Sequence, residues 1–145
     1  MGGKETLRRK ITEVVGGRII AANGIVEVSK IPGAMEQQFF LYLSEEHIRQ
    51  GAEIIYEPHV FRIYGRDGNT ESTTPDFLIR FPDGRCCYIE ITTSDLNGKD
   101  PKGRQKRIMS HFPKVDYRVL YKADLRKIQE ENPRFSFWHA KRIQG

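Results

Sequence analysis

Two acidic residues stand where a predicted β-hairpin would bring them face to face. Asp76 lies at the start of the run Pro75 to Phe81, and Glu90 lies in the run Arg85 to Thr93. Both runs are typical of strands, and the Pro82-Asp83-Gly84 between them is typical of a type I turn closed by a left-handed glycine. This three-residue loop pairs Asp76 with Glu90, and directly opposed residues have Cβ atoms about 4.5–5.5 Å apart.

Opposed carboxylates repel each other, so this pair needs a positive partner. The same strand face carries Leu78, Tyr88 and Thr92. A half-apolar face beneath a helix is a costly place for two unpaired acids. Mg²⁺ takes oxygen ligands and is commonly held by one or two carboxylates, so these residues favour a magnesium site. The alternative is two solvent-exposed acids, each paired with a lysine or arginine.

The elements that must position this pair follow from breakers, caps and periodicity. Gly51 is a natural end for a helix, Pro58 indicates a bend or an edge, and Asp100-Pro101 is typical of a helix start. Asn23-Gly24 is a strong hairpin signal. Beyond the Asp76–Glu90 hairpin, these signals predict helices over 4–15, 34–50, 101–111 and 123–131, strands over 53–64, 115–121 and 135–143, a polar loop over 65–73, and an N-terminal hairpin over about 17–30.

From residue 34 the order is therefore helix, three antiparallel strands, helix, strand, helix. The strand after the crossover helix can lie parallel to a neighbour. The predicted fold is α/β, a mixed sheet flanked by helices. Length suits one compact domain over 1–145, with its core at about 34–131.

Pro75-Asp76 on one strand, Glu90-Ile91-Thr92 on the next and a basic helix afterwards resemble the PD-(D/E)xK nuclease superfamily, which has the restriction-endonuclease-like fold. The resemblance covers about 34–131 and implies the order αβββαβ. It also implies that Asp76, Glu90 and the helix acid Glu36 bind Mg²⁺, with Mn²⁺ as a substitute, and that the main-chain carbonyl of Ile91 is a further ligand. The implied activity is Mg²⁺-dependent hydrolysis of DNA phosphodiester bonds.

One position departs from this family pattern, because Thr92 stands where the family places a lysine. Either catalysis is lost or the lysine comes from elsewhere. Lys102, Gln105, Lys106 and Met109 share the spacing of one helix face, so Lys102 or Lys106 is the candidate donor. Gln105 resembles the helix glutamine of several family members. The alternative for both lysines is a solvated face or simple phosphate contact.

The balance of 24 Lys+Arg against 19 Asp+Glu, with a pI near 9.3, fits an anionic partner. Basic residues gather late in the chain, and we expect Lys99, Arg104 and Arg107 to contact DNA phosphates. The expected substrate is double-stranded or branched DNA, and the expected assembly is a homodimer.

Other chemistries find little support. The adjacent Cys86 and Cys87 point to opposite strand faces and cannot form a disulfide framework. The four histidines have no metal-ligand spacing, and no Walker or G-x-S-x-G motif occurs. No run approaches a membrane span and no signal peptide is evident, so a cytoplasmic protein is expected. The alternatives to an endonuclease are a catalytically inactive DNA-binding module of the same fold and, less favoured, a structural protein that binds no nucleic acid.

Overall fold

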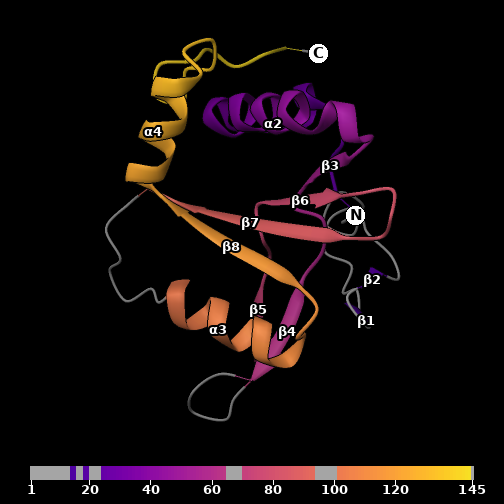
Figure 1. Cartoon of the computed structure of the whole chain (residues 1–145). Coiled ribbons are helices and arrows are strands. Elements are labelled where there is room, and N and C mark those ends of the chain that lie inside the picture. The colour runs from indigo at the N-terminus through magenta and orange to yellow at the C-terminus, as the bar shows by residue number, and fades with distance from the viewer. Residues whose placement is uncertain (1–13, 16–17, 20–23, 65–69, 94–100, 145) are drawn as a thin grey trace, which may run out of the picture.

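A mixed four-stranded sheet forms the centre of the molecule (Figure 1). The computed structural model describes residues 14–15, 18–19, 24–64, 70–93 and 101–144. The sheet has the order β3-β6-β7-β8, with β3 at Glu53–Tyr56, β6 at Phe77–Arg80, β7 at Cys86–Thr92 and β8 at Asp116–Tyr121. The first three strands are antiparallel neighbours, and β8 lies parallel to β7. The predicted α/β class and mixed sheet are confirmed.

The β6–β7 hairpin forms in the register that its turn residues predict. Phe77 pairs with Ile89 and Arg80 with Cys86. Gly84 has a φ of 95°, which a residue with a Cβ rarely adopts. The Phe81 carbonyl accepts from the Gly84 amide at 3.0 Å, and the Phe81 amide donates to the Arg85 carbonyl at 2.9 Å. This register fixes which residues of β7 lie beside the start of β6.

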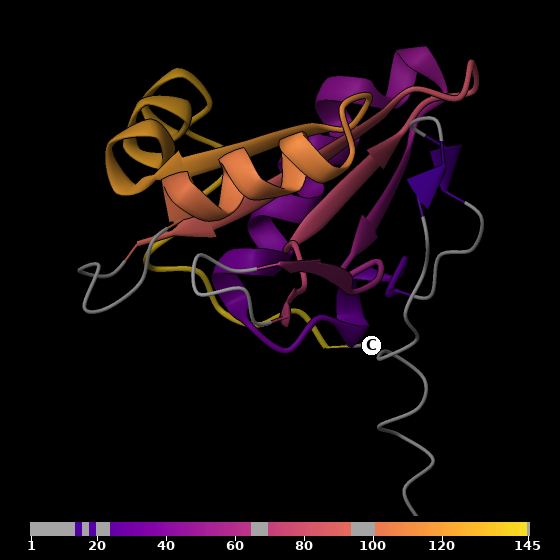
Figure 2. The same ribbon diagram turned by 90° about the horizontal axis from the view of Figure 1, so that it is seen from below.

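Helices cover both faces of the sheet. Helices α2 (Ala34–His47) and α4 (Lys122–Glu131) lie on one side, and α3 (Pro101–His111) lies on the other (Figures 1 and 2). The 3₁₀ turn η2 (Ile48–Gln50) follows α2 and closes at Gly51, which has a φ of 70°. The predicted helices over 34–50, 101–111 and 123–131 are thus confirmed.

The sheet separates two apolar cores. Phe39 of α2 packs with Phe77 and Ile89 on one face, whereas Ile108 of α3 packs with Leu78 and Tyr88 on the other. Their alternation along β6 and β7 is that of a sheet buried on both sides. Each face therefore has its own packing, and polar side chains at the strand ends lie at the margin of these cores.

The predicted strand over 53–64 is wrong in one respect, because the chain leaves the sheet after β3. Glu57 has a φ of 48°, and the chain then turns through Pro58. The second half becomes β4 (Phe61–Tyr64), which pairs with β5 (Thr70–Thr73) as a separate hairpin on the α3 side (Figure 1). The predicted loop over 65–73 therefore ends in a strand, and residues 65–69 lie outside the described residues.

Both chain ends differ from prediction. The two-residue strands β1 (Val14–Val15) and β2 (Arg18–Ile19) pair with each other. Of the predicted hairpin over 17–30, residues 17 and 20–23 lie outside the described residues; in the described part, Ile25 bridges to Tyr56 of β3, and Val28–Lys30 form the 3₁₀ turn η1. The predicted helix over 4–15 lies mostly outside the described residues, and its last two residues are β1.

The C-terminal segment carries no strand over 135–143. It runs instead as bends and coil across α2, where Phe135 and Phe137 are buried. Gln37 of α2 holds it in place, because its side-chain oxygen accepts from the Ile143 amide at 2.7 Å and its nitrogen donates to the Ile143 carbonyl at 3.0 Å. Aromatic burial and this amide take the place of sheet pairing.

The outer edge of the sheet is met by side chains of two helices. On β8, the Tyr117 carbonyl accepts a hydrogen bond from the Gln105 side chain of α3 at 2.7 Å. The Tyr121 amide donates to Asp124 of α4 at 2.8 Å, as part of a capping box. Helices α3 and α4 are thereby tied to the strand that separates them.

Candidate functional site

Asp76 and Glu90 lie beside each other at one end of the sheet. Asp76 immediately precedes β6, and Glu90 is near the end of β7, one step beyond the paired Phe77 and Ile89. The Asp76 Oδ2 atom accepts a hydrogen bond of 2.6 Å from the backbone amide of Ile91. The predicted juxtaposition of these residues is therefore present, with Asp76 bound to the strand that carries Glu90.

The environment of Asp76 is acidic and only partly exposed to water. Burial raises its pKa to about 6, and the charges of Glu90 and Glu36 add to this. The Ile91 amide and Arg104 act in the opposite direction. Since these groups come from α2, β7 and α3, three elements meet at the Asp76 carboxylate.

Glu90 is buried and has two polar partners. Arg104 of α3 grips it with two nitrogens, Nε to Oε1 at 3.2 Å and Nη2 to Oε2. The Tyr117 hydroxyl of β8 donates to Oε1 at 2.7 Å. Burial lowers the pKa of Arg104, but the hydrogen bond and charge of Glu90 outweigh it and leave that pKa raised. Burial and the neighbouring Glu90 also raise the pKa of Tyr117, so its hydroxyl stays protonated and donates.

The face of α3 that meets the sheet is displaced by one residue from the predicted one. Pro101 and Ile108 are buried and Arg104 and Gln105 are half-buried, whereas Lys102, Lys106 and Met109 are exposed. Gln105 therefore faces the protein as expected, but it binds the Tyr117 carbonyl and not an acid. The residue that contacts Glu90 is Arg104, which the sequence predicts only as a phosphate contact.

The Pro101, Arg104, Gln105, Ile108 set has the same helical spacing as the lysine-bearing set. Its two apolar members are the signal that could have identified it, because the face that packs on a sheet needs apolar residues.

The remaining predicted residues have different outcomes. Glu36 lies in the first turn of α2, half-buried, with its carboxylate over Gly33 and near enough to Asp76 to raise its pKa. The Ile91 amide is used by Asp76, whereas its carbonyl as a metal ligand stays a prediction. Arg107 is half-buried on α3, and Lys99 lies outside the described residues.

No ready-made site for a metal ion occurs in the described part of the chain, in the sense of three or more His, Cys, Asp or Glu side chains grouped closely enough to hold one. The donors gathered here are the oxygens of Asp76 and Glu90, with Glu36 at the margin. Hard carboxylate oxygens suit Mg²⁺, which is usually bound by one or two carboxylates with water completing its shell.

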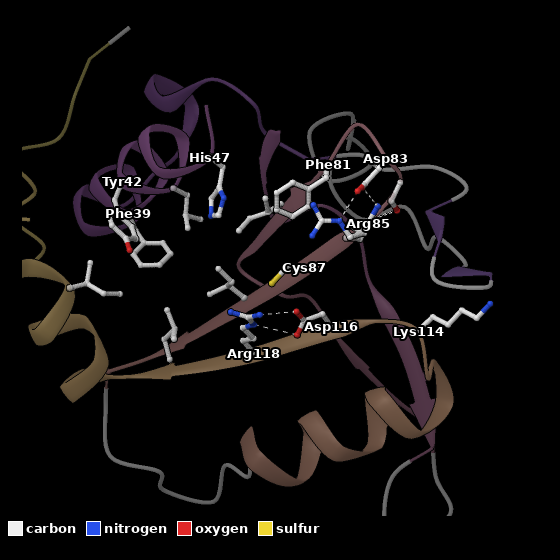
Figure 3. A pocket seen from close by; sticks show the side chains of 17 residues that line it. Phe39, Tyr42, His47, Phe81, Asp83, Arg85, Cys87, Lys114, Asp116 and Arg118 are labelled. Atoms are coloured by element: carbon white, nitrogen blue, oxygen red, sulfur yellow. Dashed lines mark hydrogen bonds and ion pairs between the residues drawn. The ribbon is translucent and has the colours of Figure 1, made fainter. Parts of the chain in front are cut away.

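A separate cavity of about 690 Å³ lies on the opposite face of the sheet, between α2, α4 and strands β6–β8 (Figure 3). Its floor is apolar, and its rim carries two arginines. Arg118 pairs with Asp116 and Arg85 with Asp83, each at a spacing of two residues. Neither Asp76 nor Glu90 lines it. The two rim arginines are neutralised by their own neighbours, and Lys114 is a further basic residue of the lining.

His59 is buried beside Phe61 and Tyr88 in the core under α3. Its Nε2 atom lies 2.6 Å from the Tyr88 hydroxyl, and burial lowers its pKa to about 4. His59 is therefore part of the packing of this core. The cysteines match expectation, because Cys86 and Cys87 are free and belong to opposite cores.

Comparisons with protein-family models, with curated proteins and with solved structures found no match to this chain. No helix among the described residues is long and apolar enough to cross a membrane.

Proposed function

We propose that this protein is a Mg²⁺-dependent DNA endonuclease with a restriction-endonuclease-like core. The observation that carries the proposal is that Asp76 and Glu90 lie beside each other at one end of the sheet, with Glu36 of α2 near enough to help raise the pKa of Asp76. Further support comes from the order α2, β3, β6, β7, α3, β8, which matches αβββαβ once the β4–β5 hairpin is set aside as an insertion.

The residues present fit a divalent cation. Burial raises the pKa of Asp76, and the charges of Glu90 and Glu36 add to the rise, so a bound cation would relieve both the lost hydration and the repulsion. Asp76 and Glu90 would hold Mg²⁺, with Glu36 and the Ile91 carbonyl as the ligands that the resemblance adds. When bound, Mg²⁺ polarises a phosphate oxygen and lowers the pKa of a coordinated water.

The chain's own groups position this chemistry. The Ile91 amide orients Asp76 by a hydrogen bond, and the Tyr117 hydroxyl orients Glu90. Lys102 and Lys106 are exposed on α3, the helix that also carries Arg104, and there they can contact DNA phosphates. Thr92 carries no amine at the end of β7, and among the described residues Arg104 is a cation that contacts Glu90 directly.

The second candidate is a DNA-binding module of the same fold without catalysis. The observation in its favour is that Glu90 already has a bidentate partner in Arg104 while Thr92 replaces the family lysine. A protein that had lost catalysis would keep such an ion pair as a purely structural link.

The test is cleavage of supercoiled plasmid and of a four-way DNA junction with Mg²⁺, Mn²⁺ or EDTA. We expect metal-dependent cleavage by the wild type and its loss in Asp76→Asn and Glu90→Gln, with Asp116→Asn, an acid on β8 outside the site, cleaving normally. Removing a metal ligand costs a reaction of this kind several orders of magnitude in rate.

The other outcomes separate the candidates. Cleavage by Asp76→Asn at the wild-type rate would contradict the site. Salt-sensitive DNA binding without cleavage under either metal would favour the inactive module. The absence of DNA binding even at low salt would contradict both candidates.

A further inference from the structure

The Arg104 side chain of α3 is firmly held. Its side chain is 21% exposed, and that of its partner Glu90 is 11% exposed. Its helix is fixed on either side, because Ile108 is buried in the core and Gln105 is bonded to the Tyr117 carbonyl. The guanidinium is therefore held in a fixed position beside Glu90.

The lone pairs of Glu90 are nearly all in use. A carboxylate offers about four acceptor positions, two on each oxygen. Arg104 takes one on each oxygen and Tyr117 takes the second on Oε1, so one position remains, on Oε2. A cation entering there would lie beside the guanidinium and be repelled by it.

The same guanidinium also acts on Asp76, since it opposes the rise in the pKa of that residue. Arg104 is thus the positive charge that both acids share in the absence of another cation. Its two contacts with Glu90 occupy oxygen positions that a divalent ion bound by this carboxylate would also need.

We infer that Arg104 is a built-in counter-cation of the acid pair, which a divalent ion must displace from Glu90 before Asp76 and Glu90 can hold it together. This inference rests on the proposed metal site. Arg104 is a positioning residue in this role, because it sets the conformation and availability of Glu90 and touches no reacting atom. The affinity of Asp76 and Glu90 for a divalent ion is then lower than it would be if Arg104 were absent.

The experiment is a titration of the full chain with Mg²⁺ by calorimetry, and with Mn²⁺ by its electron paramagnetic resonance signal, at neutral pH. The variants are Arg104→Gln, Arg104→Lys, Asp76→Asn and the matched control Arg126→Gln, which changes an exposed arginine of α4. Neither readout depends on cleavage.

We expect Arg104→Gln to bind both metals about tenfold more tightly than the wild type. Arg104→Lys should fall between them, because an ammonium is a point charge that does not grip both oxygens. Arg126→Gln should match the wild type, and Asp76→Asn should abolish binding. If Arg104→Gln is unfolded by circular dichroism, Arg104→Lys decides the question by the same comparison.

Equal or weaker metal binding by the Arg104 variants, with binding still lost in Asp76→Asn, would overturn the counter-cation while leaving the proposed function standing. Failure of the wild type and of both Arg104 variants to bind either metal would overturn the metal site itself. Binding by Arg104→Gln alone would support the inference in its strongest form.

Discussion

Two arginine–carboxylate pairs, each with two nitrogen–oxygen contacts, lie on opposite faces of the same sheet. Arg118 and Asp116 are two residues apart on β8, with side chains 64% and 46% exposed (Figure 3). Arg104 and Glu90 join α3 to β7, with side chains 21% and 11% exposed. The first pair stays solvated whether or not it forms. The second buries a carboxylate that has to be neutralised, so the same two chemical groups have different consequences.

Removing the arginine of each pair in turn should give the largest difference in the free energy of unfolding. We expect Arg104→Ala to lower the free energy of unfolding by about 3 kcal/mol, because it leaves the buried Glu90 without its counter-charge. Arg118→Ala should cost less than about 1 kcal/mol. Urea unfolding at pH 7.5 with EDTA measures both, and equal losses would show that burial does not distinguish the pairs.

A smaller effect concerns the acid next to Glu90. Since the pKa of Asp76 is raised to about 6 from 3.8, the folded protein prefers it protonated. Its contribution to stability is complete below about pH 4 and is lost as the pH rises through 6. Allowing for partial exposure, we expect Asp76→Asn to be more stable than the wild type by about 2 kcal/mol at pH 8 and no different at pH 4.

Unfolding curves at the two pH values check this prediction, with Asp116→Asn as the exposed control. A gain in the stability of Asp76→Asn that is the same at both pH values would show that ionisation of Asp76 is not the cause.

Within the site, the smallest expected effect on stability comes from removing one hydroxyl group beside the Arg104–Glu90 pair. Tyr117→Phe removes the hydroxyl that donates to Glu90 Oε1 and keeps the ring. We expect a loss of about 1.5 kcal/mol in unfolding free energy, the lower end of the range for a hydrogen bond to a charged acceptor, because Arg104 continues to neutralise Glu90. Thermal unfolding at pH 7.5 measures it. In the background of Glu90→Gln the loss should shrink, and an unchanged loss would place the effect elsewhere.

What the sequence predicted well is governed by local chemistry. The turn Pro82-Asp83-Gly84 admits one hairpin register, and that register brought Asp76 to Glu90. The ends of the helices also follow from nearby residues, such as Gly51 after α2.

What it missed depends on contacts between distant segments. Pro58 indicated a bend or an edge near the point where the chain leaves the sheet, but the pairing of the second half with β5 as a separate hairpin depends on contacts beyond this local signal. The role of Arg104 depends on the rotation of α3, which is set by the burial of Ile108. Charge pattern drew attention to Lys102 and Lys106, but apolar packing decides which side of a helix faces inward.

The hydrogen bonds at β8 bear on whether two molecules can associate through the edges of their sheets. An edge strand invites a second chain to extend the sheet. Here the Tyr117 carbonyl and the Tyr121 amide lie four residues apart on β8 and therefore point to the same side of the strand. They form hydrogen bonds with the side chains of Gln105 and Asp124. An incoming strand would find these positions filled. Gln105 and Asp124 thus deny two hydrogen-bond partners to an added strand, which opposes extension of the sheet through β8.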